Sequence, residues 1–344
     1  MTPPCQFTVI TMNILSLCDG MSCGQIALQE LGVRVDAYYA SEIKPEAIAS
    51  TKHNFPSTIH IGDVTKVSYK DGWLHTENGD FETDIDLVMF GSPCQSFSRG
   101  MRADKRIGLD DEVRSGIFIH CHRIMKEVGP KYFLLENVVM KKSDEATLTK
   151  MMGIDPIRVN SAQLTAQQRD RLYWTNIPID GAFPQRNVTM NDILDDGGYY
   201  PYEKGLCLLA SDSHGQYNGC NWTPVKRFYR WYFKRFSNLI FPSKKNFDAC
   251  VDEFNRLTEG LDMSEINATV FDDYDGHVFD DVRYLSKYER ARMQTVPEKY
   301  VDCMSEKDAA NLLGDGWTID VIKHIFKGIG KTPKQIRESF ICLF

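Results

Sequence analysis

A cysteine at the end of an apolar run is the first feature of this chain that suggests chemistry. Cys94 directly follows Pro93, after the run DLVMF and before the glycine- and arginine-containing segment 98–108. A structural cysteine is expected inside such a run, whereas a thiol at a strand end, beside a loop, is placed to act as a nucleophile. Further along the chain, a carboxyl group and two alternate arginines follow at predicted strand ends: Glu136, Arg169 and Arg171. Together these groups predict a catalytic site.

A second group of polar residues predicts a binding site for an adenosine-containing cofactor. The turn CDGMSCG (18–24) joins a predicted strand to a helix, and its glycines would let a ligand approach the backbone and the helix N-terminus. Glu42 ends the second predicted strand, the position that binds ribose hydroxyls in nucleotide-binding α/β folds. Asp63 ends the third predicted strand. The turn does not match G-x-G-x-x-G, and a tight turn without a ligand is the alternative for this loop alone.

The elements that must position these residues alternate between strands and helices. Strands are predicted at 9–17, 35–41, 58–64, 84–92 and 131–139, with helices at 25–32, 44–55 and 116–129. This alternation predicts βαβ units and a doubly wound, mostly parallel sheet in an α/β fold. The pattern breaks near residue 184 and returns near 281. We therefore expect a catalytic domain at 1–183, a smaller inserted domain at 184–280 and a return to the catalytic domain at 281–344.

Composition limits the function classes. The chain has 344 residues, a hydrophobic content of 42% and a formal net charge of −7, which argues mildly against nucleic acid unless a local basic patch exists. Its ten cysteines include no C-x-x-C pair, so we expect free thiols and no structural metal. No run is long and apolar enough for a membrane span, and no signal peptide is recognised, which predicts a cytoplasmic protein, or a nuclear one in a eukaryote.

The ordered motifs resemble those of the DNA (cytosine-5)-methyltransferase family. The matching segments are LCDGMSCG, SEI, GDV, GSPCQSFS, RSGIF, LLENVV and QQRDR, within 13–176, and YERARMQTVP and LLGDGWTIDVIKHIF near the end. They are most similar to the de novo branch, in a stand-alone bacterial or phage-type form, although Cys18 replaces the family's phenylalanine. The resemblance implies a Rossmann-like fold that binds S-adenosylmethionine through Cys18, Asp19, Gly20, Met21, Ser22, Cys23, Gly24, Glu42, Ile43, Asp63, Val64, Ser92, Pro93, Gly316 and Trp317.

The resemblance also implies a mechanism. Cys94 would add to C6 of a cytosine flipped out of double-stranded DNA, so that C5 can attack the methyl group. Glu136 would protonate or hydrogen-bond N3 of the base. Arg169 and Arg171 would hold O2, the neighbouring phosphates and the loop around Cys94.

Two basic segments are the expected DNA contacts. The segment after Cys94 contains Arg99, Arg102, Lys105 and Arg106. The segment WTPVKRFYRWYFKRFS (222–237), in the unmatched insert, interleaves cations with aromatic residues, and we expect Arg227, Arg230 and Arg235 to contact DNA. An amphipathic structural helix with a solvated basic face is the alternative. In the family such an insert recognises the target sequence.

Other functions stay open at this stage. A transfer-RNA cytosine-5 methyltransferase and a catalytically inactive DNA-binding homologue share parts of the pattern. A thymidylate-synthase-type enzyme also uses a Pro-Cys nucleophile, but such enzymes lack the glycine loop at the sheet edge. The target sequence, a partner restriction enzyme and the oligomeric state are not readable from the sequence.

Overall fold

The computed structural model describes residues 11–93, 116–195, 197–210, 216–217, 220–221, 223–268, 271 and 274–331. The chain divides into two compact units. Unit 1 comprises 1–160, 170–183 and 317–344, and unit 2 comprises 161–169 and 184–316. The return to unit 1 comes at Trp317 in this division, whereas the sequence suggested 281. The short excursion at 161–169 had no sequence signal.

Unit 1 is built on a seven-stranded sheet with the order β3-β2-β1-β7-β8-β10-β9. Pairing is parallel from β3 to β8, and β10 runs antiparallel to both of its neighbours. This arrangement confirms the predicted α/β fold with a mostly parallel sheet. The strands are β1 (Thr11–Leu17), β2 (Arg34–Ser41), β3 (Ile59–His60), β7 (Leu87–Phe90), β8 (Tyr132–Val138), β9 (Ile157–Asn160) and β10 (Asp170–Thr175).

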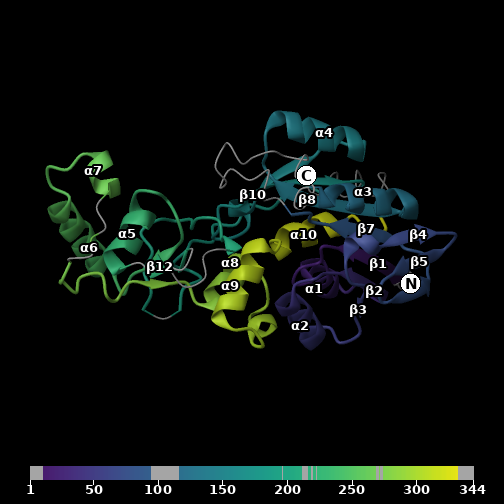
Figure 1. The fold of residues 1–344 in the computed structure, drawn as a ribbon, viewed down its shortest axis with the longest axis horizontal. Helices are drawn as coiled ribbons and strands as arrows, with labels where there is room; N and C mark the ends of the chain where they lie inside the picture. Colours follow the sequence, from purple (N-terminus) through teal and green to yellow (C-terminus); the bar gives the residue numbers. More distant parts are fainter. Residues whose placement is uncertain are drawn as a thin grey trace, which may run out of the picture. The chain divides into compact units, whose positions relative to one another are not determined.

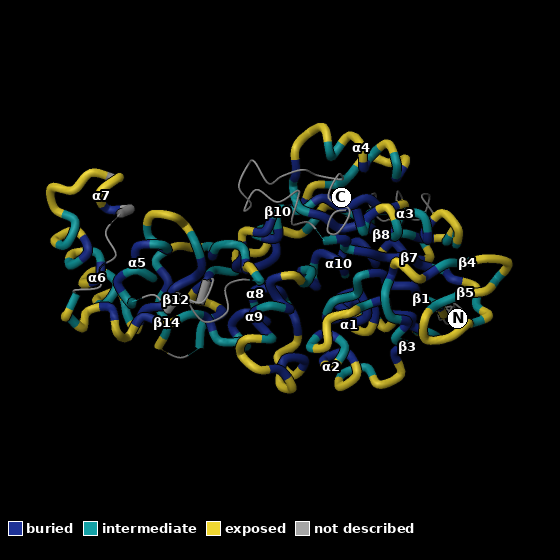
Figure 2. Tube along the Cα trace, viewed as in Figure 1, coloured by how far each residue is buried: buried dark blue, intermediate teal, exposed yellow. Residues whose placement is uncertain are grey.

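Helices cover both faces of this sheet (Figure 1). The apolar strands explain the arrangement, since alternate side chains of a strand point to opposite faces. Leu15, Leu17 and Phe90 join a buried cluster with Phe118 of α3 and Leu148 of α4, and these strands are dark blue in Figure 2. Helices α1 and α2 lie on the other side, with α10 against α1. The helices are α1 (Cys23–Glu30), α2 (Pro45–Asn54), α3 (Ile117–Val128), α4 (Lys142–Met152) and α10 (Ile319–Phe326).

A small antiparallel sheet interrupts the alternation between β3 and β7. Its strands are β4 (Ser68–Lys70), β5 (Trp73–Thr76) and β6 (Gly79–Glu82), in the order β4-β5-β6. The 3-10 helix η1 (Val64–Lys66) precedes it. Sequence reasoning missed these short strands, whose signal is the pair of turns at Asp71-Gly72 and Asn78-Gly79.

Unit 2 has an aromatic core and little regular β structure. Phe228 and Trp231 of α5, with Phe241 and Phe254, are buried in it. Its helices are α5 (Pro224–Tyr232), α6 (Lys244–Leu257), α7 (Met263–Ala268), α8 (Lys287–Met293) and α9 (Glu306–Asp315). Its short strands are β11 (Gln216–Tyr217), β12 (Cys220–Asn221), β13 (Leu239–Ile240) and β14 (Arg283–Tyr284). Further 3-10 turns are η4 (Ser161–Gln163) and η6 (Glu298–Val301).

Candidate active site

The turn between β1 and α1 has the unusual backbone that its sequence suggests. Cys18, Gly20 and Ser22 have φ angles of 54°, 59° and 55°, in the left-handed region that non-glycine residues rarely adopt. Alternating left-handed residues bring successive N–H groups toward one side of a turn, which suits the binding of polar ligand groups. The turn is therefore held in a strained form at the carboxyl edge of the sheet, where ligands of such folds bind.

Glu42 ties this turn to the end of β2. The Gly20 N–H donates to Glu42 Oε2 at 2.7 Å. The N–H groups of Ile43 and Lys44 donate to Oε1 at 2.7 and 2.9 Å. Each carboxylate oxygen has further acceptor capacity, so Glu42 can still accept a bond from a ligand hydroxyl. Ile43 beside it is 68% exposed, a large apolar side chain available for a flat ring to pack on.

Asp19 lies in a network of hydroxyl groups. Tyr38 donates its hydroxyl hydrogen bond to Asp19 Oδ1 at 2.7 Å, and the Ser22 hydroxyl donates to Oδ2. Burial raises the pKa of Asp19 from 3.8 to about 6, against the opposing hydrogen bonds from Ser16, Ser22 and Tyr38. Sequence reasoning selected Asp19 and Ser22 but missed Tyr38, which has no motif signal.

Trp317 packs against two glycines of the sheet edge. A Cβ on Gly91 would lie 2.8 Å from Trp317 Nε1, and one on Gly24 would overlap Met89 Sδ, with the Trp317 ring next to it. The Trp317 N–H donates to Cys23 Sγ at 3.3 Å. The predicted cofactor residues Cys23, Gly24 and Trp317 are thus brought together in unit 1. Met21 is also buried in this turn.

Two further predicted positions follow strands β3 and β7 of the same sheet. Asp63 begins η1, where its Oδ1 accepts the Thr65 N–H at 2.9 Å, and Val64 is buried. Ser92 follows β7, and its hydroxyl accepts from Asn137 Nδ2 at 3.3 Å. Asn137 is 1% exposed and holds the Ser92 segment, a role that sequence reasoning did not assign to it. Pro93 is the last described residue of that segment.

Glu136 and Arg171 form an ion pair at the same edge. Arg171 is paired with Val138 and Tyr173 with Glu136 in the antiparallel β8–β10 ladder, so Arg171 and Glu136 are diagonal neighbours on one face. The distance from Arg171 Nε to Glu136 Oε1 is 3.0 Å, and their side chains are 13% and 9% exposed. Because β10 is antiparallel, its first residues lie at the carboxyl edge of the parallel strands. The structure thus brings these two predicted catalytic residues together.

Arg169 belongs to unit 2, although it is only two residues from Arg171. Its guanidinium donates to the carbonyl groups of Gly314 and Gly316 at 3.2 and 2.7 Å, and its side chain is buried. Gln294 Nε2 also donates to the Gly316 carbonyl, at 3.1 Å. These contacts hold the backbone of unit 2 before Trp317. The catalytic role of Arg169 and the cofactor role of Gly316 remain predictions.

The basic segment of the insert forms the amphipathic helix α5. Its aromatic residues Phe228, Tyr229 and Trp231 are buried, so they build the core of unit 2 rather than a row of exposed stacking groups. The three predicted DNA-contacting arginines stack on rings of this unit: Arg227 on Tyr284, Arg230 on Phe236 and Arg235 on Tyr202, at 5.7, 4.6 and 4.5 Å. Arg235 is exposed, and the other two are partly exposed. This geometry agrees with the alternative of an amphipathic structural helix. DNA contact by these arginines remains a prediction.

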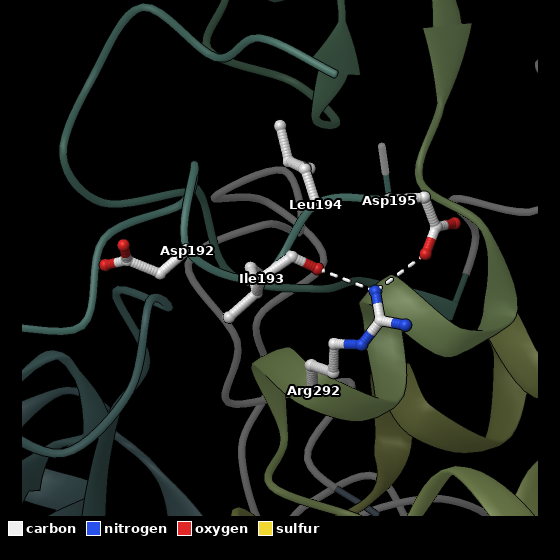
Figure 3. A pocket seen from close by; sticks show the side chains of 5 residues that line it. All are labelled: Asp192, Ile193, Leu194, Asp195 and Arg292. Atoms are coloured by element: carbon white, nitrogen blue, oxygen red, sulfur yellow. Dashed lines mark hydrogen bonds and ion pairs between the residues drawn. The ribbon is translucent and has the colours of Figure 1, made fainter. Parts of the chain in front are cut away.

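A small polar pocket lies in unit 2, and none of its lining residues was selected from the sequence. Its lining is Asp192, Ile193, Leu194, Asp195 and Arg292, with a cavity volume of about 260 Å³ (Figure 3). Arg292 donates to the Ile193 carbonyl at 2.9 Å and pairs with Asp195 at 2.7 Å. Arg292 also pairs with Glu298 at 2.8 Å. These bonds anchor the 192–195 segment to α8, which is a structural function.

The predicted nucleophile and the predicted DNA-contacting segment after it lie outside the described residues. Cys94 and the four cations Arg99, Arg102, Lys105 and Arg106 are in this group. Within the described ranges, no group of His, Cys, Asp or Glu side chains has the arrangement of a metal site. Nor does any described helix combine the length and apolarity that a membrane crossing requires.

Solved structures with similar folds support the predicted fold. Dnmt2 methyltransferase from S. pombe matches with a TM-score of 0.58 at 14% identity, covering 93% of this chain and 100% of that one. A putative DNA modification methyltransferase of an E. coli prophage matches with a TM-score of 0.54 at 18% identity, covering 92% and 98%. The sheet order and these matches confirm the predicted Rossmann-like α/β fold.

The sequence comparisons show which family the chain resembles. Residues 12–153 match the model of the C-5 cytosine-specific DNA methylases. The chain is 38% identical over 112 residues to the type II methyltransferase M.NgoBV of Neisseria gonorrhoeae, covering 33% of this chain and 23% of the relative. It is 31% identical over 182 residues to the orphan methyltransferase M.SPRI of Bacillus phage SPR, covering 49% and 38%. The chain thus spans less than two fifths of the length of these relatives. The predicted resemblance to this family, in its bacterial and phage form, is confirmed.

Proposed function

We propose that this protein transfers a methyl group from S-adenosylmethionine to C5 of cytosine in double-stranded DNA. The observation that carries the proposal is the Glu136–Arg171 pair, which lies at the same sheet edge as the Glu42-anchored turn. A carboxyl group for the base and a polar cradle for the cofactor are two of the parts that this reaction needs, beside the thiolate nucleophile. The family match over 12–153 gives the reaction class.

The residues present fit the methyl donor. Glu42 has acceptor capacity for ribose hydroxyls, and Ile43 offers an apolar surface for adenine. Asp19, bonded to Tyr38, adds a carboxyl group to the same turn. The sulfonium of S-adenosylmethionine would supply an electrophilic methyl group without a metal. Trp317, packed on Gly91, would close the apolar side of this cradle.

The cytosine would be activated by this chain's own side chains. Cys94 would add its thiolate to C6, which gives C5 the electron density to attack the methyl group as the sulfur–methyl bond of the donor breaks. Loss of the C5 proton to a base would then expel the Cys94 thiolate from C6. Glu136 would hydrogen-bond or protonate N3. Arg171, held by Glu136 at 3.0 Å, would orient that carboxyl group and donate to O2 of the base.

The target carbon is inaccessible inside a duplex, so the base must be flipped out. The cations at 99–106 would meet the phosphates next to the flipped base. Arg227, Arg230 and Arg235 on unit 2 would add contacts to the DNA backbone, since stacked guanidinium groups still have N–H donors at their edges.

The test measures methyl transfer from labelled S-adenosylmethionine to duplex DNA and, in parallel, to transfer RNA. We expect label in DNA as 5-methylcytosine, a covalent complex on DNA containing 5-fluorocytosine, and neither in Cys94→Ser. Cys303→Ser is the control, since Cys303 is an exposed thiol of unit 2 that should not affect transfer. If only transfer RNA were labelled, the substrate would be transfer RNA and not DNA. Cofactor and DNA binding without transfer would indicate an inactive binding homologue.

A further inference from the structure

The turn between β5 and β6 contacts the loop that follows β3. Glu77 Oε1 accepts the Asp63 N–H at 2.8 Å, and Glu77 Oε2 forms an ion pair with Lys66. Beside it, Asn78 Nδ2 donates to the His60 carbonyl at 3.0 Å. The loop after β3 carries Asp63 and Val64, which are predicted cofactor-binding residues. The small antiparallel sheet is therefore attached to the cofactor edge through one turn.

Gly62, in the loop after β3, shows how closely the turn between β5 and β6 approaches that loop. Its φ is +80°, and a Cβ built there would overlap Glu77 Oε1, so the carboxylate occupies the space of a side chain. On its other side the loop is bound to β2. The Ser41 hydroxyl donates to the Gly62 carbonyl at 2.8 Å, and the Ile61 N–H donates to the Ala40 carbonyl at 2.9 Å. The loop is thus held between the end of β2 and Glu77.

The charges explain why a carboxylate is stable there. Hydrogen bonding by Lys66, and then by the Asp63 N–H, lowers the pKa of Glu77, although the Asp63 carboxylate opposes this. The Lys66–Glu77 ion pair is largely exposed, with side chains 59% and 31% accessible, so that pair by itself should contribute little stability. The bond to the Asp63 N–H is different, because it fixes the backbone at the point where η1 begins.

We propose that Glu77 is a positioning residue for the cofactor, which sets the conformation of the 61–66 loop and thereby the affinity for the adenosine half of S-adenosylmethionine. The inference rests on the proposed function. It assigns a purpose to the turn between β5 and β6, in addition to the packing of Leu74 of β5 into the core of unit 1. Glu77 acts through Asp63 and not by touching the cofactor.

The experiment measures binding of S-adenosylmethionine and 5′-methylthioadenosine by calorimetry in wild type, Glu77→Ala, Glu77→Gln and Glu82→Ala. Glu82 is an exposed carboxylate of the same small sheet and serves as the matched control. We expect Glu77→Ala to raise both dissociation constants by about threefold to tenfold, the loss of one partly exposed hydrogen bond to a charged group. Glu77→Gln should bind nearly as wild type, because its amide oxygen still accepts the Asp63 N–H.

Kinetics separate positioning from a general structural effect. Glu77→Ala should raise the KM for S-adenosylmethionine while kcat at saturating cofactor stays near wild type. Equal affinity in Glu77→Ala and Glu82→Ala would overturn the inference, as would an equal loss in Glu77→Gln and Glu77→Ala. A wild-type protein that binds no S-adenosylmethionine would overturn the proposed function itself, and is distinguished from the other outcomes by that first titration.

Discussion

Replacing Asp19 with asparagine should change how the free energy of unfolding depends on pH. Burial raises the pKa of Asp19 from 3.8 to about 6, so the folded state holds this proton more tightly than the unfolded chain. For an acid shifted in this direction, the contribution to stability is fully present below pH 3.8 and is lost as the pH rises through 6. Wild-type protein should therefore gain stability from this group when the pH falls below 6.

The size of the effect follows from the shift. A displacement from 3.8 to about 6 corresponds to about 3 kcal/mol between the two limits, of which about 1.4 kcal/mol falls between pH 7.5 and pH 5. Asp19 as a whole residue keeps some exposed surface, so solvent screening reduces the expected change to about 1 kcal/mol over that range. The asparagine variant carries no titrating proton at this position and should lack this change.

Urea denaturation at several pH values between 5 and 7.5, followed by tryptophan fluorescence, measures the difference. The stability of Asp19→Asn relative to wild type should fall by about 1 kcal/mol as the pH is lowered from 7.5 to 5. Asp36 is an exposed carboxylate on β2, so the free energy of unfolding of Asp36→Asn should depend on pH in the same way as that of wild type. Tyr38→Phe removes a hydrogen bond that favours the charged form of Asp19. It should therefore shift the pH-dependent change in stability to higher pH. Parallel curves for wild type and Asp19→Asn would refute the assignment of a raised pKa.

Three further changes test the site. Arg171→Lys should reduce the rate of methyl transfer by at least about tenfold, because an ammonium group does not reproduce the planar contact with Glu136; an unchanged rate with labelled donor would contradict the proposed role. Gly91→Ala should lower thermal stability by about 1–3 kcal/mol through a clash with the Trp317 ring, and a smaller side chain at 317 should restore part of it. Neutralising the basic face of α5 and its C-terminal end should make DNA binding less salt-dependent, by up to ~0.9 log unit for each lost phosphate contact, and an unaltered slope would leave these arginines with their structural role; the residues to change are Arg227, Arg230 and Arg235.

The carboxyl edge of the sheet was predictable because its signals are local. Apolar runs that stop at a polar residue locate Asp19 and Glu42 just after β1 and β2, Asp63 three residues after β3 and Glu136 in the last three residues of β8. Parallel pairing then places those ends together without further information. In the structure, the carboxyl ends of β1, β2, β7 and β8 lie side by side, as their pairing registers show.

The contacts that tune the site were not predictable in the same way. Tyr38 reaches Asp19 across 19 residues, and Glu77 reaches Asp63 from a turn 14 residues away. Neither belongs to a motif, and each depends on a distance that only the folded chain sets. In α5, the alternation of cations and aromatic rings has two physical solutions, a nucleic-acid surface or a packed core with stacked cations. Burial of Phe228 and Trp231 satisfies the second, a result of tertiary packing and not of the helix pattern.

Arg169 and Arg171 show why sequence spacing alone does not assign roles. Alternate residues of one strand face the same side, so the pattern R-x-R suggested two arginines at one site. The strand β10 begins only at Asp170, however, and Arg169 lies in the segment that unit 2 includes. The sheet register therefore positions Arg171 beside Glu136, whereas backbone carbonyl groups of unit 2 position Arg169. One arginine is oriented toward a carboxyl group that the proposed reaction uses. The other donates to backbone carbonyl groups immediately before Trp317. The two arginines of the R-x-R pattern therefore have different surroundings, and only Arg171 lies beside the carboxyl group of Glu136.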